Sequence, residues 1–104
     1  MSSLLLPSLF KDDRYIDVIS ENIKEQMKKQ MKEDSNKMYW IGKQDMAEPF
    51  KKIKPDQNFY INSKGKLVIS FNEYDVAPGY MGVVEFTIPT SVLKDVLVSD
   101  MYIH

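Results

Sequence analysis

The sequence predicts an α+β domain in which a long amphipathic helix packs on a small antiparallel sheet of three or four strands, followed by a short C-terminal helix. Apolar residues recur every three or four positions across residues 12–32, whereas from residue 58 they recur at every second position. The helix therefore has one apolar stripe and the sheet one apolar face, and packing them together removes both from water. Since the chain has 104 residues, 43% of them hydrophobic, residues 1–104 are expected to form a single domain.

The first predicted element is the helix over residues 12–32. Asp12 and Asp13 stand at its start and lysines dominate its end, which is the arrangement that complements the helix dipole. Its methionines are interpreted as core-filling side chains rather than as a methionine-rich binding groove. The residues predicted to share its buried face are Ile16, Ile19, Ile23, Met27 and Met31.

Residues 34–56 have the least regular pattern of the chain. Residues 38–41 are apolar and aromatic and are a candidate for the fourth strand. Pro49 and Pro55 favour an irregular connection after them, with at most one helical turn near residues 45–48. The lysines of this connection are interpreted as solvated surface rather than as a nucleic-acid contact; they are Lys51, Lys52 and Lys54.

A β-hairpin is predicted next, because the chain alternates with a period of two on both sides of residues 63–65. Phe59 and Ile61 alternate with Tyr60 and Asn62, and then Leu67, Ile69 and Phe71 alternate with Lys66, Val68 and Ser70. Gly65 is well placed for the left-handed position of the connecting turn. A third strand is predicted over residues 83–88, with one apolar face, and Pro89 ends it. The residues of that face are Val84, Phe86 and Ile88.

The last predicted element is a short helix after the third strand. Thr90 or Ser91 is expected to cap its N-terminus. Its apolar stripe is formed by Val92, Leu93, Val96 and Leu97.

Charge and composition exclude several classes of function. The 14 basic and 15 acidic side chains nearly cancel, which argues against a dedicated nucleic-acid binder. The absence of cysteine excludes disulfides, thiolate nucleophiles and cysteine-based metal sites. No apolar run approaches the roughly 20 residues that span a bilayer. The apolar start of the chain lacks a basic region and is interrupted by Pro7, so a signal peptide is not predicted.

Few residues offer catalytic chemistry. The single histidine, His104, is the last residue and is poorly placed to act as a base or a metal ligand. Three carboxylates, Glu73, Asp75 and Glu85, lie near the same loop, and two of them would suffice for acid/base catalysis. They are interpreted as solvent-exposed instead. We therefore predict no enzyme activity, no cofactor and no metal.

The segment YDVAPGYMGVVEF, residues 74–86, carries the strongest binding signal. Pro78 restricts the backbone and lowers the entropy lost on docking, while the flanking glycines permit turn conformations closed to other residues. Tyr80 is a residue type enriched among the energetic anchors of interfaces. The pattern alone leaves open whether Tyr80 and Met81 are displayed or pack locally.

The run from Phe59 to Leu97 resembles the extracellular C-terminal domain of RsiV-type anti-sigma factors, a domain also found in some peptidoglycan deacetylases. That family has a strand pair with a glycine-containing turn, a Tyr-x-x-Ala-Pro-x-Tyr-x-Gly motif, a strand ending in Ile-Pro and a short helix. The matching positions in this chain are Tyr74, Ala77, Pro78, Tyr80, Gly82, Ile88 and Pro89. The start of the domain, at Leu9 to Lys11 before the long helix, is similar as well.

The resemblance implies a lysozyme sensor on the outer face of a Gram-positive cell membrane. Proteins of this type hold an extracytoplasmic-function sigma factor inactive, and lysozyme binding makes them substrates for regulated proteolysis that releases it. The resemblance covers only the outer domain, so this chain is expected to bind, with signalling and membrane contact left to segments outside it. The residues implied at the partner surface are Tyr74, Ala77, Pro78, Gly79, Tyr80 and Met81.

Two alternatives remain open at this point. The deacetylases that share the domain act on cell-wall glycan, so the chain is alternatively a peptidoglycan-binding module in which Tyr74, Tyr80 or Trp40 stacks on sugar rings. A third reading is a small glycan hydrolase that uses the carboxylates near the loop.

Overall fold

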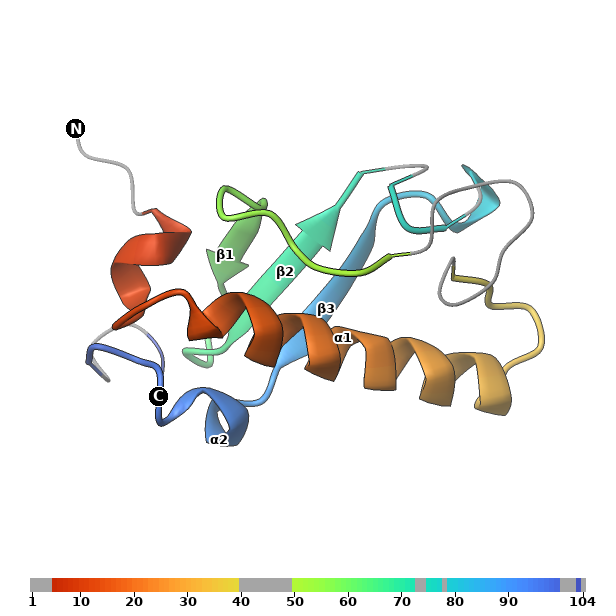
Figure 1. Ribbon diagram of the computed structural model, residues 1–104. Coiled ribbons are helices and arrows are strands. Elements are labelled where there is room, and N and C mark those ends of the chain that lie inside the picture. Colours follow the sequence, from red (N-terminus) through yellow and green to blue (C-terminus); the bar gives the residue numbers. More distant parts are fainter. Residues whose placement is uncertain (1–4, 40–49, 73–74, 78, 100–102, 104) are drawn as a thin grey trace.

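The computed structural model describes residues 5–39, 50–72, 75–77, 79–99 and 103. After a single 3₁₀ turn, η1 (Leu6–Leu9), the long helix α1 (Arg14–Glu33) crosses the molecule (Figure 1). Strands β1 (Phe59–Ile61), β2 (Leu67–Phe71) and β3 (Val84–Ile88) form an antiparallel sheet in the order β1-β2-β3. A second 3₁₀ turn, η2 (Gly79–Met81), precedes β3, and the short helix α2 (Thr90–Leu93) follows it. The predicted α+β class is confirmed.

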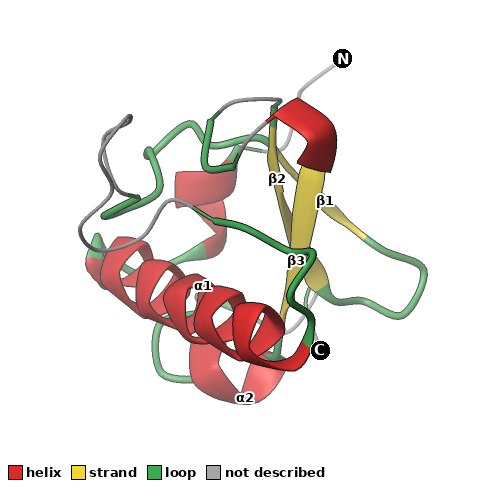
Figure 2. Ribbon diagram, turned by 90° about the vertical axis from the view of Figure 1, so that its right-hand side faces the viewer, coloured by secondary structure: helices red, strands yellow, loops and turns green. Residues whose placement is uncertain are grey.

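The core lies between α1 and one face of the sheet, as Figure 2 shows from the end of the helix. Ile19, Ile23 and Met27 of α1 are completely buried against the alternating inward side chains of β3. Those inward residues are Val84, Phe86 and Ile88, as their period of two predicts. The interpretation of Met27 as core filling is therefore confirmed, while Met31 and Ile16 pack partly buried at the margins of the core.

One buried polar side chain joins α1 to the irregular segment beyond it. Ser20 is 1% exposed, and its Oγ accepts a hydrogen bond of 2.9 Å from the backbone N–H of Ile53. Lys52, the residue before Ile53, forms a 2.8 Å ion pair with Asp17 of α1. These contacts fix residues 52–53 against the helix, and Lys52 has its ion-pair partner within the domain.

Four aromatic rings form a continuous row through the core. Phe86 lies at its centre, 6.0 Å from the ring of Phe71 and 5.5 Å from that of Tyr39. Phe50 meets Phe71 edge to face at 5.5 Å. Such tilted arrangements are the favoured geometry for aromatic pairs. The row ties residues on both sides of positions 40–49 to the centre of the sheet.

The two ends of the described chain meet beside the N-terminus of α1. Phe10 forms an isolated antiparallel bridge with Leu97. The N–H of Lys11 donates to the carbonyl of Val96 at 2.8 Å, and the N–H of Val98 donates to the carbonyl of Leu9 at 3.0 Å. The ring of Phe10 also stacks on Tyr15 at 4.6 Å, which closes this end of the core.

The hairpin turn matches its prediction, since Gly65 has φ +76°. The side-chain Oδ1 of Asn62 accepts hydrogen bonds of 3.0 Å from the N–H groups of Lys64 and Lys66 and so organises the turn. On the outer face of the sheet, however, Val68 is buried, only 3% exposed. It lies opposite Tyr60 in register, and the Tyr60 hydroxyl reaches across to Glu85 at 3.0 Å, so the tyrosine covers it.

Two local predictions are wrong. Met38 and Tyr39 are not in a strand, and the remainder of the candidate strand, Trp40 and Ile41, lies outside the described residues, as does the candidate turn at residues 45–48. The cap of α2 is Pro89, which has extended backbone angles. Thr90 is already inside the helix, and its hydroxyl accepts a hydrogen bond from Lys66 at 3.2 Å instead.

The buried tyrosines predict a loss of stability at alkaline pH. Burial raises the pKa of Tyr15, with a smaller contribution from Asp13, and burial raises the pKa of Tyr39. In the unfolded chain both phenols ionise near pH 10. Above that pH the unfolded state binds fewer protons than the folded state, so stability is retained below about pH 10 and falls as pH rises through the folded pKa values.

Urea unfolding between about pH 8 and 11 measures this decline. Tyr15→Phe is the informative variant, because the Tyr15 hydroxyl makes only a long 3.5 Å contact with the carbonyl of Pro55. The variant is expected to unfold with a weaker dependence on pH in this range. An identical pH dependence in both proteins would contradict the assignment to Tyr15.

Candidate functional site

The candidate site is the connection between β2 and β3, in which Asn72 and Asp75 are hydrogen-bonded to each other. The N–H of Asn72 donates to Oδ2 of Asp75 at 3.1 Å, and the N–H of Asp75 donates back to the carbonyl of Asn72 at 3.1 Å. Val76 and Ala77, which follow, are buried, with 3% and 2% of their surface exposed. The connection is therefore anchored in the core directly before it reaches the surface.

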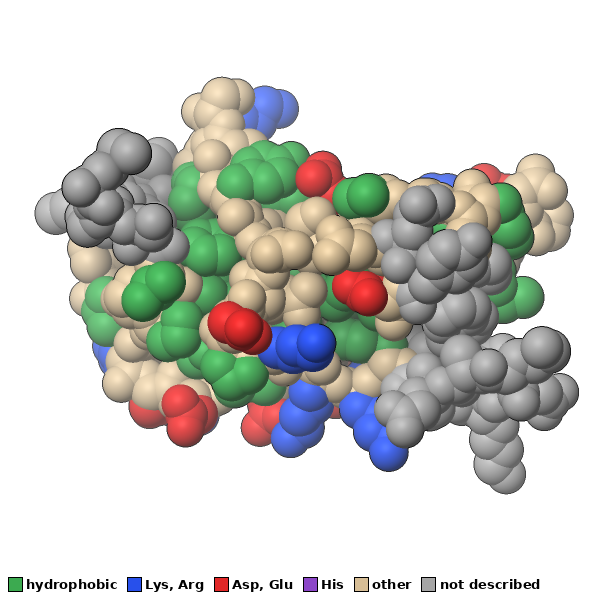
Figure 3. Space-filling model, turned by 90° about the horizontal axis from the view of Figure 1, so that it is seen from above, with side chains coloured by type: hydrophobic (Ala, Val, Ile, Leu, Met, Phe, Trp, Pro, Cys, Tyr) green, Lys and Arg blue, Asp and Glu red, His purple; other side chains and the backbone are tan. Residues whose placement is uncertain are grey.

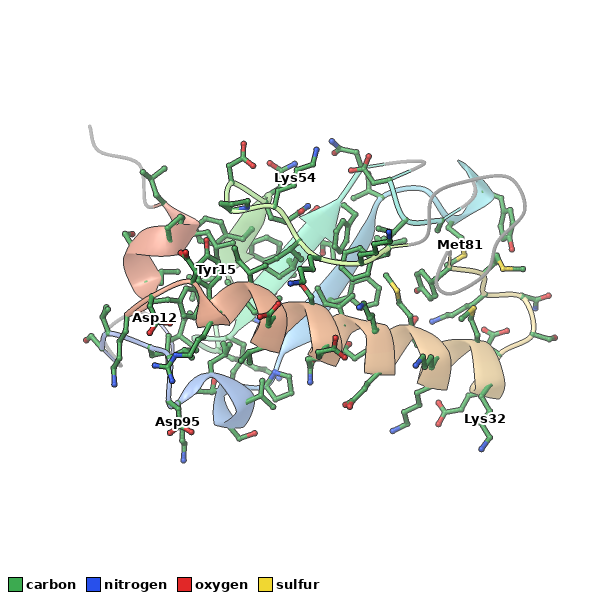
Figure 4. All side chains as sticks on the ribbon, in the orientation of Figure 1. Asp12, Tyr15, Lys32, Lys54, Met81 and Asp95 are labelled. Carbon is green, nitrogen blue, oxygen red and sulfur yellow. The ribbon has the colours of Figure 1, made fainter. Side chains whose placement is uncertain are left out.

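The second half of the connection displays one large side chain. In η2, Tyr80 is 71% exposed, whereas Met81 is partly buried and packs against the core. Figure 4 shows Met81 between η2 and the C-terminal end of α1. The two residues thus divide the roles that the sequence left open: Tyr80 is displayed and Met81 packs beneath it.

Gly82 closes the turn after η2. Its N–H donates to the carbonyl of Gly79 at 2.9 Å, and its φ of +65° is a conformation that other L-residues rarely adopt. A Cβ atom built at Gly82 would meet nothing within 4 Å. The backbone therefore requires the glycine, and the space beside it is open to an approaching partner.

The turn after α1 contributes to the same end of the molecule (Figure 1). The hydroxyl of Tyr80 donates to the backbone carbonyl of Asn36 at 3.2 Å, across a large separation in sequence. Met38, two residues further on, is 41% exposed, and Val83, just before β3, is 59% exposed. We call Met38, Tyr80 and Val83 the tip surface. Residues 34–38 could not be assigned to this surface from sequence, because the contact with Tyr80 uses a backbone carbonyl.

The carboxylates considered for catalysis have structural partners. Asp75 accepts a hydrogen bond from Asn72, as described above, and Glu85 accepts one from the hydroxyl of Tyr60 at 3.0 Å. That hydrogen bond raises the pKa of Tyr60, with lesser contributions from desolvation and from the charge of Glu85. Within the described ranges, no three histidine, cysteine, aspartate or glutamate side chains are grouped so that they could hold a metal.

A shallow hollow of about 340 Å³ lies beside the anchored half of the connection. Phe50, Phe71 and Val76 contribute its apolar part, and polar side chains of both charge signs surround them. Figure 3 looks onto the side of the molecule crossed by residues 50–58, where acidic and basic groups are interspersed. The polar lining residues are Lys52, Lys54, Asp56, Gln57, Asn58, Asn72 and Asp75.

Several residues singled out in the sequence lie outside the described residues. These are Trp40, Glu73, Tyr74, Pro78 and His104. Of the predicted partner-binding residues, Ala77, Gly79, Tyr80 and Met81 are described, and among them Tyr80 is the one with a largely exposed side chain. No helix in the described parts of the chain combines the length and the apolar character that crossing a membrane requires.

Comparison with known proteins agrees with this architecture. The family model described as a protein of unknown function, DUF3298, matches residues 7–91. The chain is 69% identical over 101 residues to the anti-sigma-V factor RsiV of Bacillus subtilis strain 168. That alignment covers 97% of this chain but 35% of the relative, so this chain spans only a part of the relative's length.

Among solved structures, a member of the DUF3298 family from Bacteroides fragilis NCTC 9343 superposes with a TM-score of 0.66. It shares 24% sequence identity, and the match covers 93% of this chain and 36% of that one, so the likeness concerns the fold. Because the family model matches most of the sequence and the similarity to RsiV runs through nearly all of it, the chain belongs to the DUF3298 family and is a domain of the RsiV type.

Proposed function

We propose that this chain is the lysozyme-binding sensor domain of an anti-sigma factor. The observation that carries the proposal is the exposed Tyr80, which stands 71% exposed on a connection anchored by buried residues on both sides. An exposed aromatic side chain on a rigid base is the type of group that dominates the energetics of interfaces. The relationship to an anti-sigma factor over nearly the whole chain supports the class of parent protein.

In this proposal lysozyme docks on the tip surface, with Tyr80 entering a concave part of the enzyme. Ala77 and Met81 support the loop from below, and Gly79 shapes η2. The open side of Gly82 allows close approach of the partner, since no side chain stands there. Tyr74 and Pro78, which the family resemblance implies as partner contacts, complete the proposed set of partner-binding residues.

The signalling steps belong to the rest of the parent protein. Binding of lysozyme outside the membrane makes the parent a substrate for regulated proteolysis, which releases an extracytoplasmic-function sigma factor. The domain itself carries a formal charge of -1, so it provides little long-range attraction for a basic enzyme. Shape and the buried aromatic contact therefore supply most of the affinity in this mechanism.

Calorimetric titration of the domain with a c-type lysozyme tests the proposal. We expect one-to-one binding to lysozyme, without hydrolysis of glycan by the domain. An absence of heat with a domain whose circular dichroism shows that it is folded would contradict the proposal.

The alternative function is a glycan-binding module of a cell-wall enzyme. The hollow lined by Asn72, Asp75 and Val76 favours it, because an aromatic ring next to amide and carboxylate groups suits the faces and hydroxyls of a sugar. Sedimentation of the domain with purified cell wall distinguishes the two functions. Sedimentation of the domain with the cell wall, together with no binding to lysozyme, would favour the alternative.

A further inference from the structure

The hydroxyl of Tyr80 is the starting point, because it is the part of this exposed residue for which the structure gives a polar partner. The ring stands 71% exposed, so packing restrains its rotation only weakly. Its hydroxyl donates to the carbonyl of Asn36 at 3.2 Å. The direction in which the ring is presented therefore depends on where this carbonyl is held.

Asp34 holds the turn that carries this carbonyl. Its Oδ1 accepts a hydrogen bond from the N–H of Asn36 at 3.0 Å, and its backbone carbonyl accepts one from the N–H of Lys37 at 3.1 Å. Its own N–H donates to the carbonyl of Gln30 at 2.8 Å and joins the turn to the last turn of α1. The side chain of Asp34 thus bonds the peptide group directly before the one that receives Tyr80, and its backbone carbonyl bonds the receiving peptide group itself, through the N–H of Lys37.

The far end of the turn is fixed to the core. Tyr39 is 3% exposed, its hydroxyl donates to Oε1 of Gln30 at 2.6 Å, and its ring lies 5.5 Å from that of Phe86. The same Gln30 oxygen accepts a hydrogen bond from Nζ of Lys37 at 3.4 Å. Residues 34–37 are therefore held at both ends, by α1 and by the row of aromatic rings.

We propose that residues 34–37 hold the Tyr80 side chain in place and that Asp34 is a positioning residue for recognition. This inference rests on the proposed function for its partner, lysozyme. The Asp34 side chain fixes Asn36 through its N–H, and the carbonyl of the same residue holds the tyrosine ring in the orientation that enters the partner. Restricting an exposed side chain before binding reduces the conformational entropy lost in the complex. Loss of the Asp34 side chain therefore weakens binding although Tyr80 itself is unchanged.

The first measurement uses the free domain, so it does not depend on the partner. Tyrosine rings labelled with ¹³C report the order of Tyr80 by NMR relaxation in the wild type, in Asp34→Ala and in Asp34→Asn. We expect a more mobile Tyr80 ring in Asp34→Ala and wild-type order in Asp34→Asn, because the amide retains the oxygen that accepts from Asn36. Equal order of the ring in Asp34→Ala and wild type would overturn the inference.

The second measurement is the affinity for c-type lysozyme. Asp34→Ala is expected to bind about 2- to 10-fold more weakly than wild type, and Asp34→Asn is expected to restore binding. In the Tyr80→Phe background, where the hydroxyl is missing, Asp34→Ala is expected to have no further effect. A full additional loss in that background would overturn the inference. If wild type does not bind lysozyme, the proposed function fails, and the order of the ring in the free domain still decides whether Asp34 positions Tyr80.

Discussion

Phe86→Ala is expected to lower the free energy of unfolding by about 3–5 kcal/mol. Phe86 is 1% exposed and stands at the centre of the aromatic row, between Phe71 and Tyr39. Its removal leaves a cavity that two rigid rings on opposite sides cannot fill without shifting. A domain of this size has a total stability of about 5–15 kcal/mol, so a large share of it would be lost.

Urea unfolding followed by circular dichroism measures this change as a lower midpoint. Val83→Ala is the matched control, since it truncates an apolar side chain that is 59% exposed close to the same strand. The control is expected to stay within about 0.5 kcal/mol of wild type. Similar losses in both variants would mean that the ring row does not organise the core.

Tyr80→Ala is expected to weaken lysozyme binding by about 2 kcal/mol or more, which corresponds to roughly a 30-fold higher dissociation constant. The substitution removes the largest exposed side chain of the tip surface while leaving the partly buried Met81 and the buried Ala77 in place. Since Tyr80 contributes little to the core, the unfolding midpoint is expected to change only slightly. The predicted effect thus separates recognition from stability.

Calorimetry of Tyr80→Ala and Val92→Ala side by side measures this effect. Val92 is 38% exposed on α2, away from η2, so the control removes an exposed apolar side chain outside the tip surface. We expect the control to bind as wild type does. Unchanged binding by a folded Tyr80→Ala would remove the loop from the recognition mechanism.

The elements with a strong period were predictable from sequence. The helix predicted over residues 12–32 forms over Arg14–Glu33, because its apolar stripe has one surface to cover. The alternation in β3 and the left-handed position of Gly65 also follow from local chemistry alone. These features depend on neighbouring residues, which the sequence displays directly.

The features that sequence did not predict all depend on contacts between distant segments. Ser20 reads as a neutral helical residue, yet it is buried because the N–H of Ile53 requires an acceptor there. Val68 occupies an outward position and is buried because Tyr60 bends over it toward Glu85. The hydrogen bond from the Tyr80 hydroxyl to the Asn36 carbonyl could not be predicted, because every residue type has a backbone carbonyl. The connection that carries Tyr80 was predictable as a turn before β3, but the segment that accepts its hydrogen bond was not.

The bridge between Phe10 and Leu97 has a consequence for how the domain forms. It pairs residues from nearly opposite ends of the chain, and contacts of such long sequence separation slow the search for the native state. During synthesis the helix emerges long before the strands that it covers. Its apolar stripe therefore stays exposed until those strands have appeared, and the domain reaches its protected state late.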